Sequence, residues 1–134
     1  MLVDDDAELC SLLGEFLTRE GFTVECAHEG ARGLERALSP GVDLVLLDVS
    51  MPDGGGWAAA RGLREVCPGI RLVAFTSFDN ALVIRTIAAA GINAYVTKGS
   101  AIEVLLAAIH GEDVMPAPPQ RMSLIRRTAG VTTD

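Results

Sequence analysis

Hydrophobic residues in this chain follow two patterns that alternate along it. Short apolar stretches at residues 2–4, 22–26, 42–48, 70–75 and 94–96 are typical of strands. The stretch at 42–48 is so continuously apolar that it predicts a strand buried on both faces of a sheet. The segments between them, at residues 7–19, 31–38, 57–66, 80–90 and 102–110, are predicted helices.

The first and last predicted helices carry clear start signals. Asp6 is a suitable N-cap for the first helix, and Ser100 with Glu103 three positions later forms a Ser-x-x-Glu capping box before the last. The first helix also has an apolar stripe at three- and four-residue spacing, which we expect to face the core: Leu9, Leu12, Leu13, Phe16 and Leu17.

Five strands alternating with five helices predict one α/β domain with a parallel sheet, right-handed crossovers and helices on both faces. This is a flavodoxin-like three-layer sandwich. The pattern stops at Gly111, and a Pro-rich stretch at 115–119 follows. We therefore expect a domain at residues 1–111 and a linker or C-terminal tail at 112–134.

Composition excludes several classes of protein. A formal net charge of −7 argues against direct binding to nucleic acid, which requires clustered Lys and Arg. No apolar run approaches the roughly 18 residues of a membrane span, and no basic segment precedes an apolar one as in a signal peptide. Three cysteines without CxxC spacing suggest neither a disulfide framework nor a zinc site, so a cytoplasmic location is expected.

Polar residues stand at the carboxyl ends of four predicted strands. Asp4 and Asp5 follow the first strand, Asp48 ends the third, Thr76 follows the fourth and Lys98 follows the fifth. Because the carboxyl ends of parallel strands share one edge of the sheet, we expect these side chains to meet in one pocket. Three neighbouring carboxylates favour a divalent cation, Mg²⁺ or Mn²⁺, and a lysine and a threonine beside it can donate to a phosphoryl group.

On these residues the chain resembles the receiver domain of two-component response regulators. The similarity covers residues 2 to about 111 and rests on VDDD at 3–6, LLDVSMPDGGG at 46–56, AFTS at 74–77 and AYVTKGS at 94–100. It implies a CheY-like fold with strand order 2-1-3-4-5. The stretch from Ala94 to Glu112 is similar to the LuxR-type regulators.

The resemblance also implies a role for each site residue. Asp48 would accept a phosphoryl group from a sensor histidine kinase or a phosphotransfer protein, so the domain is a signalling switch that assists its own phosphorylation and dephosphorylation and is otherwise not an enzyme. The metal ligands would be Asp4, Asp5, Asp48 and the backbone carbonyl of Ser50. Thr76 and Lys98 would bind the phosphoryl oxygens, and Tyr95 would be the aromatic switch residue.

Phosphorylation is then expected to reshape the surface formed by the fourth helix, fifth strand and fifth helix, and so to control dimerisation or an output such as transcription. The predicted helix at 80–90 is apolar nearly all round. Two interpretations of it stay open: a homodimer contact, or an ordinary helix in which Val83, Ile84 and Ile87 fill the core while small alanines face outward.

Three features depart from the usual receiver pattern. Only three residues precede Asp4, so we expect either a shortened N-terminus or a frayed first strand. Gly99 follows the lysine where receivers commonly have a cis proline, and glycines 54–56 predict a pliable loop after Asp48.

Two other functions compete with the phosphoacceptor hypothesis. A phosphatase of the haloacid-dehalogenase type also uses an aspartate at a strand end, but that family needs a second aspartate two residues on, where this chain has Ser50. The other alternative is a receiver-like module for interaction or dimerisation that works without phosphorylation.

Overall fold

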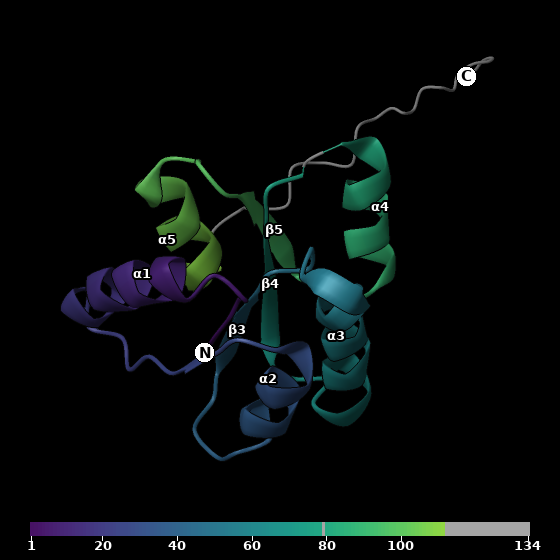
Figure 1. Cartoon of the computed structure of the whole chain (residues 1–134), viewed down its shortest axis with the longest axis horizontal. Helices are drawn as coiled ribbons and strands as arrows, with labels where there is room; N and C mark the ends of the chain where they lie inside the picture. Colours follow the sequence, from purple (N-terminus) through teal and green to yellow (C-terminus); the bar gives the residue numbers. More distant parts are fainter. Residues whose placement is uncertain (79, 112–134) are drawn as a thin grey trace.

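The computed structural model describes residues 1–78 and 80–111, which form a five-stranded parallel sheet with helices on both faces (Figure 1). The strand order is β2-β1-β3-β4-β5, which confirms the predicted topology. The strands are β1 (Leu2–Val3), β2 (Cys26–Ala27), β3 (Leu44–Leu47), β4 (Arg71–Thr76) and β5 (Ala94–Thr97). The helices are α1 (Ala7–Arg19), α2 (Gly30–Ala37), a 3₁₀ turn η1 (Pro52–Gly54), α3 (Gly55–Val66), α4 (Ala81–Ala89) and α5 (Ile102–His110). The predicted tail at 112–134 lies outside the described residues.

The sheet separates two hydrophobic cores. On one face α2, α3 and α4 contribute Ala37, Leu63 and Ile87, and on the other α1 and α5 contribute Leu17 and Leu105. Figure 1 shows α1 and α5 together on one side of the sheet. Among the described residues, no helix has the length and apolar character needed to span a membrane.

The two-residue strand β1 is paired on both sides. Leu2 lies opposite Cys26 and Leu46, and Val3 lies opposite Ala27 and Leu47. The Asp4 amide donates to the Ala27 carbonyl at 3.0 Å and the Asp48 amide donates to the Val3 carbonyl at 2.8 Å. The ladder therefore continues up to the acidic residues and fixes Asp4 beside Asp48.

The prediction of a loop at glycines 54–56 is wrong. Gly54 adopts φ +70° at the end of η1, while Gly55 and Gly56 already belong to the first turn of α3. Gly56 is buried, and a Cβ there would overlap the Asp48 carbonyl oxygen. The glycines let the helix approach the backbone closely.

Two predictions about helix details are also wrong. Ser100 does not cap α5, because its Oγ lies 2.7 Å from Thr97 Oγ1 and the N-cap position belongs to Ala101. Leu12, which was expected to face the core, is 62% exposed at the edge of the apolar stripe of α1. Cys10 of the same helix is buried instead. The bounds of α1 and its Asp6 cap are as predicted, with Asp6 Oδ1 accepting from the Leu9 amide at 3.0 Å.

The turn after β5 uses glycine in a different way from a cis proline. The described residues contain no cis peptide bond, and Gly99 has φ +95°. That left-handed conformation suits glycine, so Gly99 turns the chain from Lys98 toward α5 without a cis bond.

Candidate functional site

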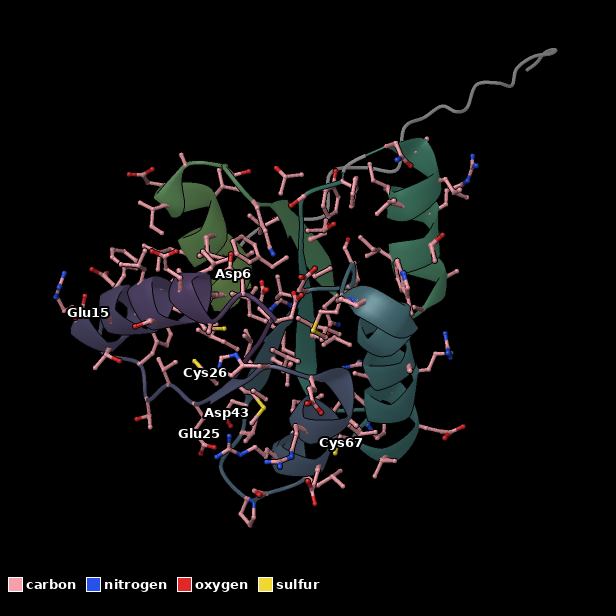
Figure 2. The ribbon with its side chains drawn as sticks, viewed as in Figure 1. Asp6, Glu15, Glu25, Cys26, Asp43 and Cys67 are labelled. Atoms are coloured by element: carbon pink, nitrogen blue, oxygen red, sulfur yellow. The ribbon has the colours of Figure 1, made fainter. Side chains whose placement is uncertain are left out.

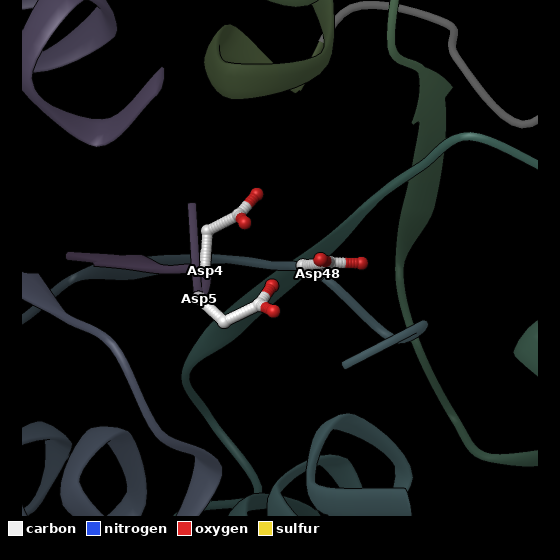
Figure 3. A group of neighbouring side chains, drawn as sticks. All are labelled: Asp4, Asp5 and Asp48. Atoms are coloured by element: carbon white, nitrogen blue, oxygen red, sulfur yellow. The ribbon is translucent and has the colours of Figure 1, made fainter. Parts of the chain in front are cut away.

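Three aspartates meet at the carboxyl edge of the sheet. One carboxylate oxygen each of Asp4, Asp5 and Asp48 lies within 4.8 Å of the other two. Figure 3 shows Asp4 and Asp5 at the end of β1 next to Asp48 at the end of β3. Asp4 and Asp48 are buried, whereas Asp5 is exposed at the rim.

Lys98 joins two of these carboxylates. Its Nζ lies 2.8 Å from Asp4 Oδ2 and 3.2 Å from Asp48 Oδ2. The turn after β5 places it there, because the Lys98 amide donates to the Thr76 carbonyl at 2.7 Å. The ammonium also lies 5.7 Å from the centre of the Phe75 ring, which is within range of a cation–π attraction.

Thr76 and Ser50 form a second, uncharged part of the site. The fully buried Thr76 hydroxyl lies 3.1 Å from Ser50 Oγ and accepts from the Phe78 amide at 3.1 Å. The Ser50 amide donates to Asp48 Oδ1 at 2.9 Å. Ser50 therefore connects the acidic cluster to Thr76 through its side chain and its amide, although sequence reasoning considered only its carbonyl.

Tyr95 lies on β5 on the opposite side of the sheet from α1 and α5. It is half-buried and packs against the core that α2, α3 and α4 cover. In the β4–β5 register it pairs with Ala74, two positions before Thr76 pairs with Thr97. Tyr95 therefore lies on the strand that pairs with Thr76 and leads to Lys98, and its switch role stays a prediction.

The pKa values of Asp48 and Lys98 are both raised, which disfavours the charged form of Asp48 and favours the charged form of Lys98. Burial raises the pKa of Asp48, and the charge of Asp4 adds to this, while the Ser50 amide and Lys98 oppose it. For Lys98, burial acts to lower the pKa, but hydrogen bonding to Asp4 and the charge of Asp48 outweigh it, so the pKa is raised. Lys98 is therefore held in its charged form between two carboxylates.

The donor set fits a hard divalent cation. Carboxylate and carbonyl oxygens are the ligands that Mg²⁺ prefers, and Mn²⁺ accepts the same set. Three clustered carboxylates against one ammonium leave an excess of negative charge, which such an ion would relieve.

Two residues that sequence reasoning left out hold the backbone of Asp4. His28 Nδ1 lies 3.1 Å from the Asp4 carbonyl oxygen, and Cys10 Sγ donates to the same oxygen at 3.6 Å. The Asp6 amide donates to Asp4 Oδ1 at 2.9 Å. No sequence motif marks these contacts, because they depend on how α1 and the segment after β2 pack around the end of β1.

Comparisons with known proteins indicate one family. The family model described as "Response regulator receiver domain" matches residues 1–110. The uncharacterized transcriptional regulatory protein YkoG of Bacillus subtilis is 36% identical over 109 residues, which cover 81% of this chain and 48% of YkoG. The chain spans about half the length, or less, of the first curated relatives it matches.

Solved structures of response regulators have a similar fold. The BeF3-activated N-terminal receiver domain of Klebsiella pneumoniae RstA has a TM-score of 0.75 at 30% identity, covering 81% of this chain and 92% of that one. A LuxR-family two-component response regulator from Aurantimonas sp. SI85-9A1 has a TM-score of 0.76 at 25% identity, covering 93% and 92%. The LuxR-type subfamily stays a prediction. With the family model matching residues 1–110 and the fold shared with solved receivers, the chain belongs to the response regulator receiver domains of two-component signalling.

Proposed function

We propose that this receiver accepts a phosphoryl group on Asp48 from the phosphohistidine of a sensor histidine kinase or a phosphotransfer protein. The observation that carries the proposal is the position of Lys98, whose ammonium contacts Asp48 and Asp4 in a cluster of three carboxylates. Together these residues provide a nucleophile, a cation for phosphoryl oxygens and oxygen donors for a metal.

In the transfer step, a lone pair of an Asp48 carboxylate oxygen forms the new O–P bond as the N–P bond of the phosphohistidine breaks. The leaving imidazole keeps the electron pair of that bond and takes up a proton. The Ser50 amide holds Asp48 Oδ1 at 2.9 Å and so orients the carboxylate before the donor arrives. Lys98, already 3.2 Å from Asp48 Oδ2, then interacts with the phosphoryl oxygens.

Asp4, Asp5, Asp48 and the Ser50 carbonyl would hold Mg²⁺ or Mn²⁺ at this site. When bound, the ion would neutralise negative charge of the phosphoryl group beside the three carboxylates. The exposure of Asp5 leaves this part of the cluster open to solvent, from which an ion would enter.

Phosphorylation switches the surface formed by α4, β5 and α5 in this proposal. The aspartyl phosphate adds charge of about −1.5 to −2 and new acceptor oxygens, which draw the Thr76 hydroxyl away from Ser50 and Phe78. Because Thr76 pairs with Thr97, movement of Thr76 is transmitted to β5, and Tyr95 rotates toward the space that is vacated.

The switched surface provides a homodimer contact. Leu82 on α4 is 65% exposed, whereas Ile87 on the same helix is fully buried and anchors it to the core. Large apolar side chains are exposed on both helices of this surface, Leu82 on α4 and Ile102 and Val104 on α5, which favours a contact with a second copy. In a longer regulator located in the cytoplasm, dimerisation would then control an output such as transcription.

Phosphorylation with acetyl phosphate and Mg²⁺ tests the proposal on a Phos-tag gel and by intact-mass spectrometry. We expect one retarded band and one added phosphoryl group for the wild type, neither for Asp48→Asn, and wild-type behaviour for Asp43→Asn, which removes an exposed aspartate outside the cluster. An unmodified wild type would support the alternative of a phosphorylation-independent interaction module. Steady turnover of a phosphate monoester would instead support the phosphatase alternative.

A further inference from the structure

Two of the three cysteines lie together between α1 and the sheet. Cys10 is on α1 and is 2% exposed, and Cys26 begins β2 and is half-buried. The Cys26 Sγ donates to the Cys10 carbonyl at 3.8 Å. A Cβ added at Gly14, one turn further along α1, would lie 3.9 Å from the same sulfur. The Cys26 thiol is therefore directed at the turn of α1 that begins at Cys10.

The two thiol side chains also interact with each other. Burial raises the pKa of the Cys10 thiol to about 12, and the charge of Cys26 and a hydrogen bond with its side chain contribute to the rise. All three cysteines of the chain are free thiols. Cys67, labelled with Cys26 in Figure 2, packs against the core on the other face of the sheet. The fold therefore brings Cys10 and Cys26 together and keeps Cys67 apart.

Both cysteines belong to segments that hold the backbone of Asp4. The Cys10 S–H donates to the Asp4 carbonyl at 3.6 Å. Cys26 is followed on β2 by Ala27, whose carbonyl accepts from the Asp4 amide at 3.0 Å. The next residue is His28, whose Nδ1 lies 3.1 Å from the Asp4 carbonyl oxygen. A covalent bond between the two sulfurs would therefore act on Asp4 through α1 and through β2.

We propose that Cys10 and Cys26 are a peroxide-sensitive pair, which forms an intramolecular disulfide and thereby weakens the binding of a divalent cation at Asp4. The effect on the cation rests on the function proposed above. A partly exposed thiol beside a buried second thiol is the arrangement expected of a reactive cysteine and its resolving partner. Because a disulfide holds its two Cβ atoms about 3.8 Å apart, it would tie α1 to β2 at this point.

The oxidation takes place in two steps. The Cys26 sulfur attacks one oxygen of hydrogen peroxide as the O–O bond breaks, which gives a Cys26 sulfenic acid and one water. The Cys10 sulfur then attacks the Cys26 sulfur, the S–O bond breaks, and the leaving oxygen takes up the Cys10 proton to form a second water. The two thiols together lose two electrons, and the peroxide gains them. The Cys10 S–H that donated to the Asp4 carbonyl is consumed in the second step.

Treatment with hydrogen peroxide, followed by alkylation and peptide mass spectrometry, tests the disulfide. We expect the chain to lose the mass of two hydrogen atoms and to yield a linked Cys10–Cys26 peptide, while Cys67 is still alkylated. Dithiothreitol should restore both thiols. Cys67→Ser should form the same link, whereas Cys26→Ser should form no intramolecular link. A link to Cys67, or a sulfinic acid at Cys26 beside an unmodified Cys10, would overturn the proposal.

Calorimetric titration with Mg²⁺ tests the effect on the site. In the Cys67→Ser background the oxidised chain should bind Mg²⁺ about tenfold more weakly than the reduced chain, a change typical of losing a hydrogen bond behind a metal ligand. The double variant Cys26→Ser/Cys67→Ser should bind equally before and after peroxide. Equal affinity of the oxidised and reduced forms would overturn the effect on Asp4. A reduced chain that binds no Mg²⁺ would overturn the proposed function together with this effect, whereas the linked peptide by itself decides whether the disulfide forms.

Discussion

Gly56 has no side chain, and this allows α3 to pack directly against the backbone of Asp48. It lies in the first turn of α3, directly against the segment that follows β3. A Cβ at this position would overlap the Asp48 carbonyl oxygen and lie 2.6 Å from Val49 Cα, both of which are backbone atoms. The backbone cannot yield as a flexible side chain could, so α3 packs here only with glycine.

Replacing Gly56 with alanine should therefore destabilise the domain. We expect Gly56→Ala to lower the free energy of unfolding by about 1–3 kcal/mol, the usual range for overpacking, as measured by urea denaturation. Gly69→Ala is the matched control, because a Cβ there meets nothing within 4 Å. Equal stability of the two variants would show that α3 can move away from Asp48.

The exposed carboxylate of Asp5 gives a second prediction at the scale of one residue. Asp5→Asn should weaken Mg²⁺ binding by about tenfold or more in calorimetric titration, because it removes one negative charge from the cluster of three. Asp6→Asn makes the same change of charge one residue later, and asparagine keeps the cap on α1. We expect near wild-type affinity for Asp6→Asn, and equal weakening by both variants would argue for a diffuse electrostatic effect instead of a ligand.

At the scale of elements, α1 and α5 contrast in how they begin. Asp6 caps α1 through its side chain, whereas Ala101 at the N-cap of α5 has no side chain that can do so. The serine that could have served stands one position too early and contacts Thr97. The backbone of Ala101 nevertheless has the extended conformation of an N-cap, with φ −59° and ψ 148°.

Supplying the missing oxygen should stabilise the domain. We expect Ala101→Ser to raise the free energy of unfolding by about 0.5–1 kcal/mol, because its hydroxyl can accept from the exposed amides of the first turn of α5. Ala101→Val, which adds no acceptor and is as poor an N-cap as alanine, is the control and should not raise the free energy of unfolding. A decrease in stability for Ala101→Ser would mean that the turn after Lys98 cannot accommodate a capping side chain.

The order of the elements could be predicted from sequence because the apolar periods change sharply between strand and helix. Details at element ends could not, since they depend on neighbours that the local pattern does not contain. The strand predicted at 22–26 begins only at Cys26, because β1 offers a partner for only two residues. The glycines at 54–56 read locally as a loop, whereas close packing onto Asp48 makes two of them helical.

For the whole molecule, the meeting of Asp5, Asp48 and Lys98 could be predicted because one rule about parallel strands places all their carboxyl ends together. The contacts that other residues make around this cluster could not be predicted. The link from Ser50 to Thr76 and the support of the Asp4 carbonyl by His28 join parts of the chain 26 and 24 residues apart. Such contacts follow from side-chain packing in three dimensions and leave no periodic trace in the sequence.

The proposed dimer surface gives a prediction about the whole molecule. With Mg²⁺ and beryllofluoride, which mimics the phosphoryl group, the wild type should shift from monomer to dimer in size-exclusion chromatography with light scattering. Leu82→Asp should stay monomeric, because it places a charge on the α4 contact without removing core packing. Leu12→Asp makes the same change at a residue of similar exposure on α1, 62% against 65%, and should still dimerise. Dimerisation of Leu82→Asp at the wild-type concentration dependence would place the contact on another face and separate activation from α4.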